Sequence, residues 1–306
     1  MRNPSELYAL SDDQPALDRP VLVQALTGFV DAGNASRLAR EHLLTIGEPR
    51  VVATFDLDEL YDYRGRRPPM LFVEDHWEHY EQPHLVIQLL HDAAGSPFLL
   101  LEGPEPDLQW ERFTAAILEL VKRFGVRLTI GMNAIPMAVP HTRPSGVTAH
   151  ATRAELITGY EPWLQRVQVP GSVSNLLEFR LGQHSHDAVG FVAHVPHYVA
   201  LAEYPAAAER LIGCLTKATG LLLPTDELHA AAEAVRADID VQIAQADEAA
   251  SLVRALEEQY DAFTRGRNGN NLLAEQTGPL PTAEEIGAEL ERFLAEHTRN
   301  GEEPPL

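Results

Sequence analysis

The chain has 306 residues and a mass of 33.8 kDa, which suits one large domain with an appendage. A formal net charge of −21 argues against binding to nucleic acid or to anionic lipid, because both need a basic surface. The single cysteine, Cys214, excludes an intrachain disulfide and a cysteine-rich metal centre. The sequence shows no signal-peptide pattern and no apolar run of membrane-spanning length, so we expect a cytoplasmic protein.

The first two thirds of the chain alternate between short apolar runs and segments with helical spacing. We expect strands at residues 21–26, 51–55, 85–90, 98–101, 126–132 and 188–193. We expect helices at residues 34–46, 108–124, 173–181 and 204–218, the last of which ends at Gly220. Such alternation favours an α/β layered domain with a mostly parallel or mixed sheet.

After Gly220 the composition changes. Residues 221–306 hold 18 acidic and 6 basic residues, a net charge of −12. Residues 225–265 contain apolar side chains at helical spacing and predict one long amphipathic helix or a helical hairpin bent near Asp247. We therefore expect an α/β domain at 1–222, a helical subdomain at 223–267 and a flexible acidic tail at 268–306. The apolar face of the helical subdomain is the predicted partner surface: Leu228, Val235, Ile239, Val253, Leu256 and Tyr260.

Polar residues gather where predicted strands end, which is where open α/β sheets bind ligands. The segments at 24–35, 131–144, 170–178 and 194–198 define a candidate ligand pocket, formed by Thr27, Asp31, Asn34, Asn133, His141, Arg143, Glu178, His194 and His197. In a catalytic reading, Arg143 would hold an anion and Asn133 and Asp31 would orient the substrate. His141 or His194 would then be the acid–base group.

Each of these segments also has a structural interpretation. Asp31 or Asn34 can cap the helix that follows, and Ser172 can cap the next one. The prolines of 131–144 can stiffen a loop, and the histidines of 194–198 can form an ordered polar corner. Neither a phosphate-binding loop nor a dinucleotide fingerprint is present, and the histidine spacing does not fit a helical ligand pair, so we expect no metal and no cofactor.

Eight segments in chain order carry a family resemblance: 26–35, 56–68, 101–107, 131–144, 170–178, 194–198, 204–207 and 256–261. They include Thr27-Gly28-Phe29-Val30-Asp31 and Asp62-Tyr63-Arg64-Gly65-Arg66-Arg67-Pro68. On these motifs the chain resembles the proteasome-assembly-chaperone-2-like family, in its actinobacterial branch, from about residue 20 to 263.

The resemblance implies a three-layer α/β sandwich similar to nucleoside phosphorylases and hydrolases, followed by a C-terminal helical subdomain. It also implies a homo-oligomer, because related proteins self-associate. Eukaryotic relatives hold proteasome subunits during assembly, so we predict a non-catalytic, cytoplasmic protein-binding or assembly-chaperone-like homo-oligomer. The alternative is a nucleoside phosphorylase- or hydrolase-like enzyme, or a small-molecule binder, that uses the strand-end pocket.

One departure from the family pattern concerns the proteasome. Relatives that dock on it end in a hydrophobic-Tyr-x tail, whereas this sequence ends in Pro304-Pro305-Leu306. Docking by that route is therefore not expected.

Overall fold

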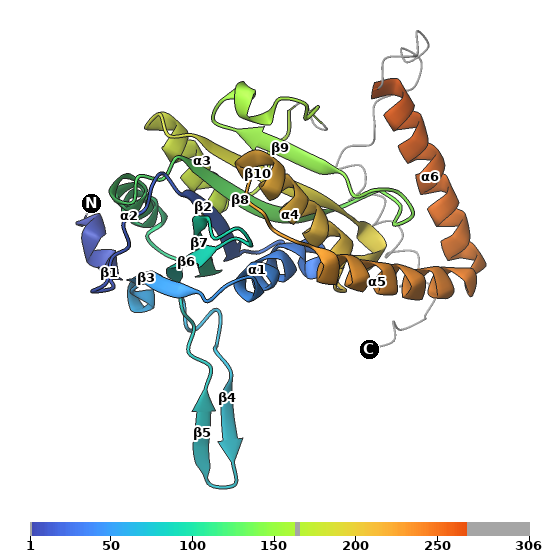
Figure 1. Cartoon of the computed structure of the whole chain (residues 1–306). Coiled ribbons are helices and arrows are strands. Elements are labelled where there is room, and N and C mark those ends of the chain that lie inside the picture. Colours follow the sequence, from blue (N-terminus) through green and yellow to red (C-terminus); the bar gives the residue numbers. More distant parts are fainter. Residues whose placement is uncertain (1, 163–165, 268–306) are drawn as a thin grey trace. The chain divides into compact units, whose positions relative to one another are not determined.

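The computed structural model describes residues 2–162 and 166–267, which form a layered α/β structure (Figure 1). The main sheet has eight strands in the order β1-β3-β6-β7-β2-β8-β10-β9. Its central strands β7, β2, β8 and β10 are parallel, and the outer pairs are antiparallel. This mixed sheet with helices on both faces confirms the predicted fold class.

The strands of the main sheet are β1 Tyr8–Leu10, β2 Val21–Thr27, β3 Arg50–Phe55, β6 Val86–His91, β7 Pro97–Pro104, β8 Leu128–Met137, β9 Val147–Ala151 and β10 Ala188–Pro196. The helices are α1 Ala35–Thr45, α2 Trp110–Arg123, α3 Val173–Gln183, α4 Pro205–Thr219, α5 Asp226–Ala244 and α6 Asp247–Arg267. A separate two-stranded sheet is formed by β4 Met70–Val73 and β5 His76–Tyr80.

Two apolar cores lie on opposite faces of the main sheet. Val23 and Ala25 of β2 pack in the core that includes α1 and α4. Leu22 and Leu26 of the same strand pack in the core that includes α2 and α3. Because β2 is covered on both faces, its sequence is apolar almost throughout, as the predicted strand at 21–26 requires.

Local signals place the helix ends. Ser172 accepts a hydrogen bond at its hydroxyl from Asn175 N at 3.2 Å and so caps α3, which confirms that interpretation. Gly220 ends α4 with a φ of 78°, a conformation that suits glycine. A short break after Ala244 separates α5 from α6, so the amphipathic stretch after residue 225 is two helices with α6 starting at Asp247.

The described chain divides into two units at residue 257, so the end of α6 after Glu257 belongs to the second unit. The predicted boundaries at residues 222 and 267 stay predictions, and the predicted tail at 268–306 lies outside the described residues. Within the described ranges, no helix combines the length and the apolar character needed to cross a membrane.

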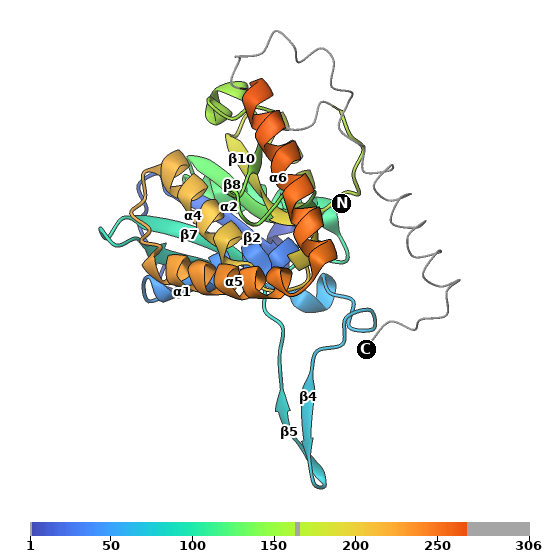
Figure 2. The ribbon, with the colours of Figure 1, turned by 90° about the vertical axis from the view of Figure 1, so that its right-hand side faces the viewer.

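The β4–β5 hairpin extends away from the layered sheet (Figures 1 and 2). Its two strands pair with each other and, in the described part of the chain, with no further strand. Phe72 and Trp77 stack edge to face, with ring centroids 5.1 Å apart, and are 53% and 63% exposed. A two-stranded hairpin is at best marginally stable alone in water.

A partly buried histidine, His186, links stability to pH. The ring of His186 lies with Nε2 3.0 Å from Thr129 Oγ1, and burial lowers its pKa from the ordinary 6.5 while Asp187 opposes the shift. The unfolded chain therefore takes up this proton at a higher pH than the folded chain does. The free energy of unfolding should fall as the pH drops through about 6.5 and should level off below the folded-state pKa.

Urea unfolding at a series of pH values from neutral to mildly acid checks this prediction. His186→Gln should flatten the pH dependence, and the exposed His184→Gln should leave it as in the wild type. Equal slopes for the wild type and His186→Gln would contradict the assignment.

Candidate functional site

The nine predicted pocket residues fall into three groups rather than one. The first two groups follow the carboxyl ends of parallel strands, whereas two members of the third, Asn133 and Glu178, lie within β8 and α3. Thr27, Asp31 and Asn34 belong to the connection from β2 to α1. His141, Arg143 and His197 lie in loops after β8 and β10, while Asn133, Glu178 and His194 lie on the face covered by α2 and α3.

In the first group, Asp31 serves the start of α1. Its carboxylate oxygens accept hydrogen bonds from Ser36 N at 2.8 Å and Arg37 N at 2.9 Å. Burial raises the pKa of Asp31, and these two hydrogen bonds oppose that shift. Asn34 has left-handed backbone geometry, with a φ of 50°, and no capping hydrogen bond.

Replacing Asp31 should therefore loosen α1. Asp31→Ala removes the acceptor for two backbone N–H groups, and we expect a loss of about 1–2 kcal/mol in the free energy of unfolding, measured by urea denaturation. Asn34→Gly is the matched control, because glycine adopts the left-handed geometry readily and should cost nothing. An unchanged stability of Asp31→Ala would refute the capping role.

In the second group, His141 is held between two side chains. Its backbone N donates to the Tyr198 hydroxyl at 2.8 Å, and its ring Nδ1 lies 2.7 Å from the same oxygen. The Asp240 carboxylate can only accept, so Nε2–H of His141 donates to it at 3.0 Å, and in this neutral tautomer Nδ1 accepts from the Tyr198 O–H. Burial raises the pKa of Tyr198 to about 12, so the hydroxyl stays protonated.

The same loop is tied to α6. Arg143 pairs with Glu257 at 3.1 Å, and the Thr142 hydroxyl donates to the same carboxylate. His197 stacks edge to face on Tyr198, with centroids 5.4 Å apart. The loop after β8 is therefore anchored by its charged side chains to α5 and α6, and it carries neither a free guanidinium nor an exposed imidazole at His141.

In the third group, each side chain also has a partner within the chain. His194 is fully buried, with Nε2 2.8 Å from Thr148 Oγ1. Glu178 Oε1 lies 2.9 Å from His150 Nδ1, and Asn133 accepts a hydrogen bond from Ala134 N at 2.7 Å. The partners of His194 and Glu178 lie on β9, which is not among the predicted strands.

The amino end of α3 is likewise occupied by the protein's own groups. Val173 N donates to Glu105 Oε1 at 2.6 Å, beside the Ser172 cap. Within the described ranges, no group of three or more His, Cys, Asp or Glu side chains is arranged to hold a metal ion.

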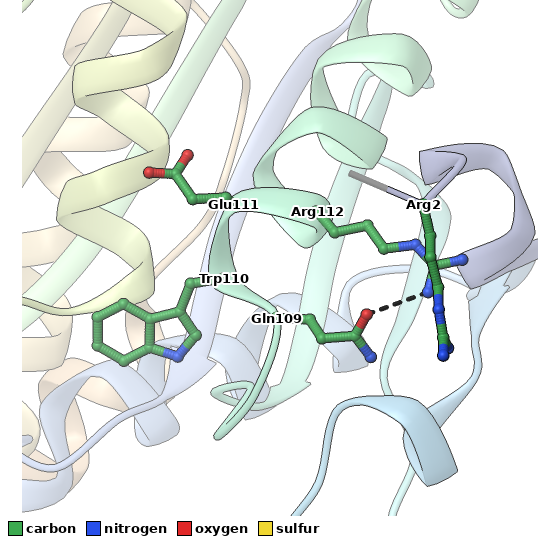
Figure 3. A pocket seen from close by; sticks show the side chains of 5 residues that line it. All are labelled: Arg2, Gln109, Trp110, Glu111 and Arg112. Atoms are coloured by element: carbon green, nitrogen blue, oxygen red, sulfur yellow. Dashed lines mark hydrogen bonds between the residues drawn. The ribbon is translucent and has the colours of Figure 1, made fainter.

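One hollow lies away from these groups, and another borders the second group at Tyr198. The first, of about 410 Å³, lies at the start of α2 and is lined by Arg2, Gln109, Trp110, Glu111 and Arg112 (Figure 3). The Arg112 guanidinium donates to Gln109 and to the Asn3 carbonyl, so it is already satisfied. The other hollow, of about 150 Å³, is mainly apolar and is lined by Tyr198, Val199, Ile239, Gln242, Ile243, Ala249, Leu252 and Val253.

The predicted partner surface on α5 and α6 packs largely inside the chain. Leu228 and Ile239 join the core on the α1–α4 face, and Val235 packs against it. Val253 and Leu256 are also buried, whereas Tyr260 belongs to the second compact unit. The large apolar side chains that stay exposed on these helices are Val241 and Leu252.

Exposed apolar side chains gather instead on the hairpin. Met70, Leu71, Phe72, Trp77 and Tyr80 are each 41–63% exposed, and they include neighbouring residues that point to opposite faces. We call these five side chains the hairpin surface. The apolar run at 70–73, with Trp77 and Tyr80 after the polar pair Glu74-Asp75, is the signal that could have revealed it.

This architecture defines a class: a three-layer α/β sandwich with an inserted hairpin and two following helices. A family model described as the PAC2 family matches residues 25–243, and the chain belongs to this family. The resemblance seen in the sequence is thereby confirmed.

Solved structures of similar proteins have the same fold. A Mycobacterium tuberculosis protein of unknown function, Rv2714, is 50% identical, with a TM-score of 0.82 over 86% of this chain and 91% of that chain. A Corynebacterium glutamicum protein of unknown function is 38% identical, with a TM-score of 0.80 over 84% and 97% of the two chains.

A M. tuberculosis protein described as a proteasome-assembly chaperone homologue, Rv2125, is 27% identical, with a TM-score of 0.71 over 76% and 99% of the two chains. Among curated proteins, none matches.

Proposed function

We propose that this protein is a non-catalytic, cytoplasmic, assembly-chaperone-like protein that binds other proteins and works as a homo-oligomer. The observation that carries the proposal is the hairpin surface. Family membership supports it, since a family relative is described as a proteasome-assembly chaperone homologue.

The exposed apolar side chains of the hairpin surface favour a role as a permanent protein–protein interface. Both faces of the ribbon carry exposed apolar side chains, and both of its backbone edges lack a strand partner in the described chain. Such a surface is a target for aggregation unless it is covered. Every copy of the chain carries the same surface. A homo-oligomer can therefore cover the hairpin surface without a second kind of protein.

The predicted pocket residues are hydrogen-bonded or ion-paired within the chain, which supports a protein-binding role over a catalytic one. Asp31 caps a helix, His141 is held by Tyr198 and Asp240, and Arg143 is paired with Glu257. An acid–base or anion-binding role would require these groups to leave their present partners. The nucleoside phosphorylase- or hydrolase-like alternative therefore has less support from the geometry.

Sedimentation velocity of the purified chain tests the proposal. We expect a species of at least twice the 33.8 kDa chain mass at micromolar concentration, with no lighter species. A single species of one chain mass across the concentration range would refute the homo-oligomer and leave the hairpin surface to a different partner.

A further inference from the structure

A second set of exposed apolar side chains surrounds the start of α2. Leu108 precedes this helix and is 50% exposed, while Val169, before α3, and Phe179 of α3 are each 59% exposed. Together with Trp110, the first residue of α2, we call these side chains the α2–α3 surface. It lies on the helical layer that covers one face of the main sheet.

Contacts between these segments hold the surface together. A Cβ atom at Gly171 would lie 3.9 Å from Trp110 Cζ3, so the segment before α3 lies against the indole. The Arg180 guanidinium lies over the Phe179 ring, 5.5 Å from its centroid, and Arg180 Nε donates to Glu111 Oε2 at 2.9 Å. The side chains of the surface therefore gather around the first turn of α2.

The surface also contains a hollow that is large enough for an aromatic side chain. It is the hollow of about 410 Å³ to which Trp110 contributes (Figure 3). The indole is held there because its Nε1–H donates to the Pro106 carbonyl at 2.7 Å. At protein interfaces, the side chains that contribute most to affinity are commonly aromatic residues of one partner that fill a pocket of the other.

Charge indicates which surface can receive the hairpin of another copy. Residues 70–81 hold four acidic residues and no lysine or arginine, so pairing two hairpins would bring four carboxylates against four others. Residues 226–257 of α5 and α6 hold eight acidic and two basic residues, so the exposed Val241 and Leu252 also lie among negative charges. Like charges across an interface oppose association, so neither contact is favourable.

The α2–α3 surface is bordered by arginines instead. The Arg2 side chain lines the hollow, is 72% exposed and pairs with Glu59 at 3.4 Å. Arg166, three residues before Val169, is exposed and has no acidic partner in the described part of the chain. An acidic ribbon with apolar side chains therefore matches this surface both in charge and in apolar character.

We infer that the hairpin surface of one copy docks on the α2–α3 surface of a second copy, with an aromatic side chain of the hairpin in the hollow beside Trp110. This inference rests on the proposed homo-oligomer and names the surface that receives the hairpin. Because each chain carries both surfaces, two or more copies can close into an assembly in which every hairpin is covered.

Val169→Asp combined with Phe179→Asp tests the receiving surface by sedimentation velocity. Both positions are mostly exposed, so the fold should persist, and the added carboxylates should repel the acidic hairpin. We expect an apparent Kd that is raised roughly a hundredfold or more. Leu201→Asp with Val241→Asp is the matched control and should sediment as the wild type does. Arg166→Glu is a milder variant and should weaken association more at low salt than at high salt.

Mixing two defective variants separates this inference from the proposed function. Phe72→Ser with Trp77→Ser keeps an intact α2–α3 surface, and Val169→Asp with Phe179→Asp keeps an intact hairpin. We expect each variant alone to sediment as single chains and an equimolar mixture to associate, because one hairpin and one receiving surface remain complementary.

The possible failures are distinguishable. Dissociation of the hairpin variant with retained association of Val169→Asp and Phe179→Asp would overturn the inference and leave the homo-oligomer standing. A mixture that stays as single chains up to the solubility limit would also overturn the inference. A wild type that is itself a single chain would refute the homo-oligomer and the inference together.

Discussion

Phe72→Ser combined with Trp77→Ser should dissociate the homo-oligomer into single chains. Truncation of a central aromatic side chain at a protein interface typically costs about 2–4 kcal/mol. Two such losses amount to at least about 4 kcal/mol, which corresponds to roughly a thousandfold weaker association. Sedimentation velocity at matched concentrations measures this directly, as a shift to the 33.8 kDa species.

The matched control is a pair of exposed apolar residues outside the hairpin. Leu201 is fully exposed and Val241 is 57% exposed, so Leu201→Ser with Val241→Ser removes similar apolar surface. This control should sediment as the wild type does. Retained association of the hairpin variant, or equal dissociation of the control, would show that the hairpin surface does not hold the oligomer together.

Gly103→Ala should cause the largest loss of stability of any single methyl addition in the sheet. Gly103 has a φ of 131°, which side chains rarely adopt, and its Cβ would lie 2.3 Å from the His84 carbonyl oxygen and 2.8 Å from Leu85 Cα. Backbone atoms cannot rotate away from this contact, so strain and overpacking combine. We expect a loss of about 3–4 kcal/mol in the free energy of unfolding by urea denaturation.

Gly125→Ala separates the two contributions. Gly125 also has a positive φ, of 64°, but its Cβ would meet nothing within 4 Å. We expect a loss of about 1 kcal/mol from the backbone conformation alone. Similar losses at both positions would mean that the base of the hairpin, where His84 meets Gly103, yields more easily than the contact suggests.

The sheet and its covering helices could be predicted from the sequence because a strand that is buried on both faces has a nearly continuous apolar sequence. The strand at 21–26 is apolar except for Gln24, and Gly220 marks the end of α4. β9 was missed although Val147, Ala149 and Ala151 alternate with Thr148 and His150, because the strand is five residues long and two of its three core-facing side chains are alanines. The hairpin was missed for a related reason, since no core residue constrains it.

The candidate site could be predicted only in part. The sequence places polar residues at strand ends, but it does not show which partner each side chain takes. His141 is held by Asp240, 99 residues further along, and Arg143 by Glu257, 114 residues further along. Contacts at such separations depend on how α5 and α6 pack, which periodicity alone does not specify. The same holds for the α2–α3 surface, whose side chains come from segments as far apart as Leu108 and Phe179.

The hairpin surface carries the central claim, and hydrogen–deuterium exchange of the wild-type chain tests it most directly. If another copy covers the hairpin, the backbone amides of β4 and β5 should be protected at micromolar concentration, and protection should fall on dilution as the oligomer dissociates. In Phe72→Ser with Trp77→Ser, the same amides should exchange at the rate of an unstructured peptide. Rapid, concentration-independent exchange of the hairpin amides in the wild type, with the main sheet still protected, would contradict the account.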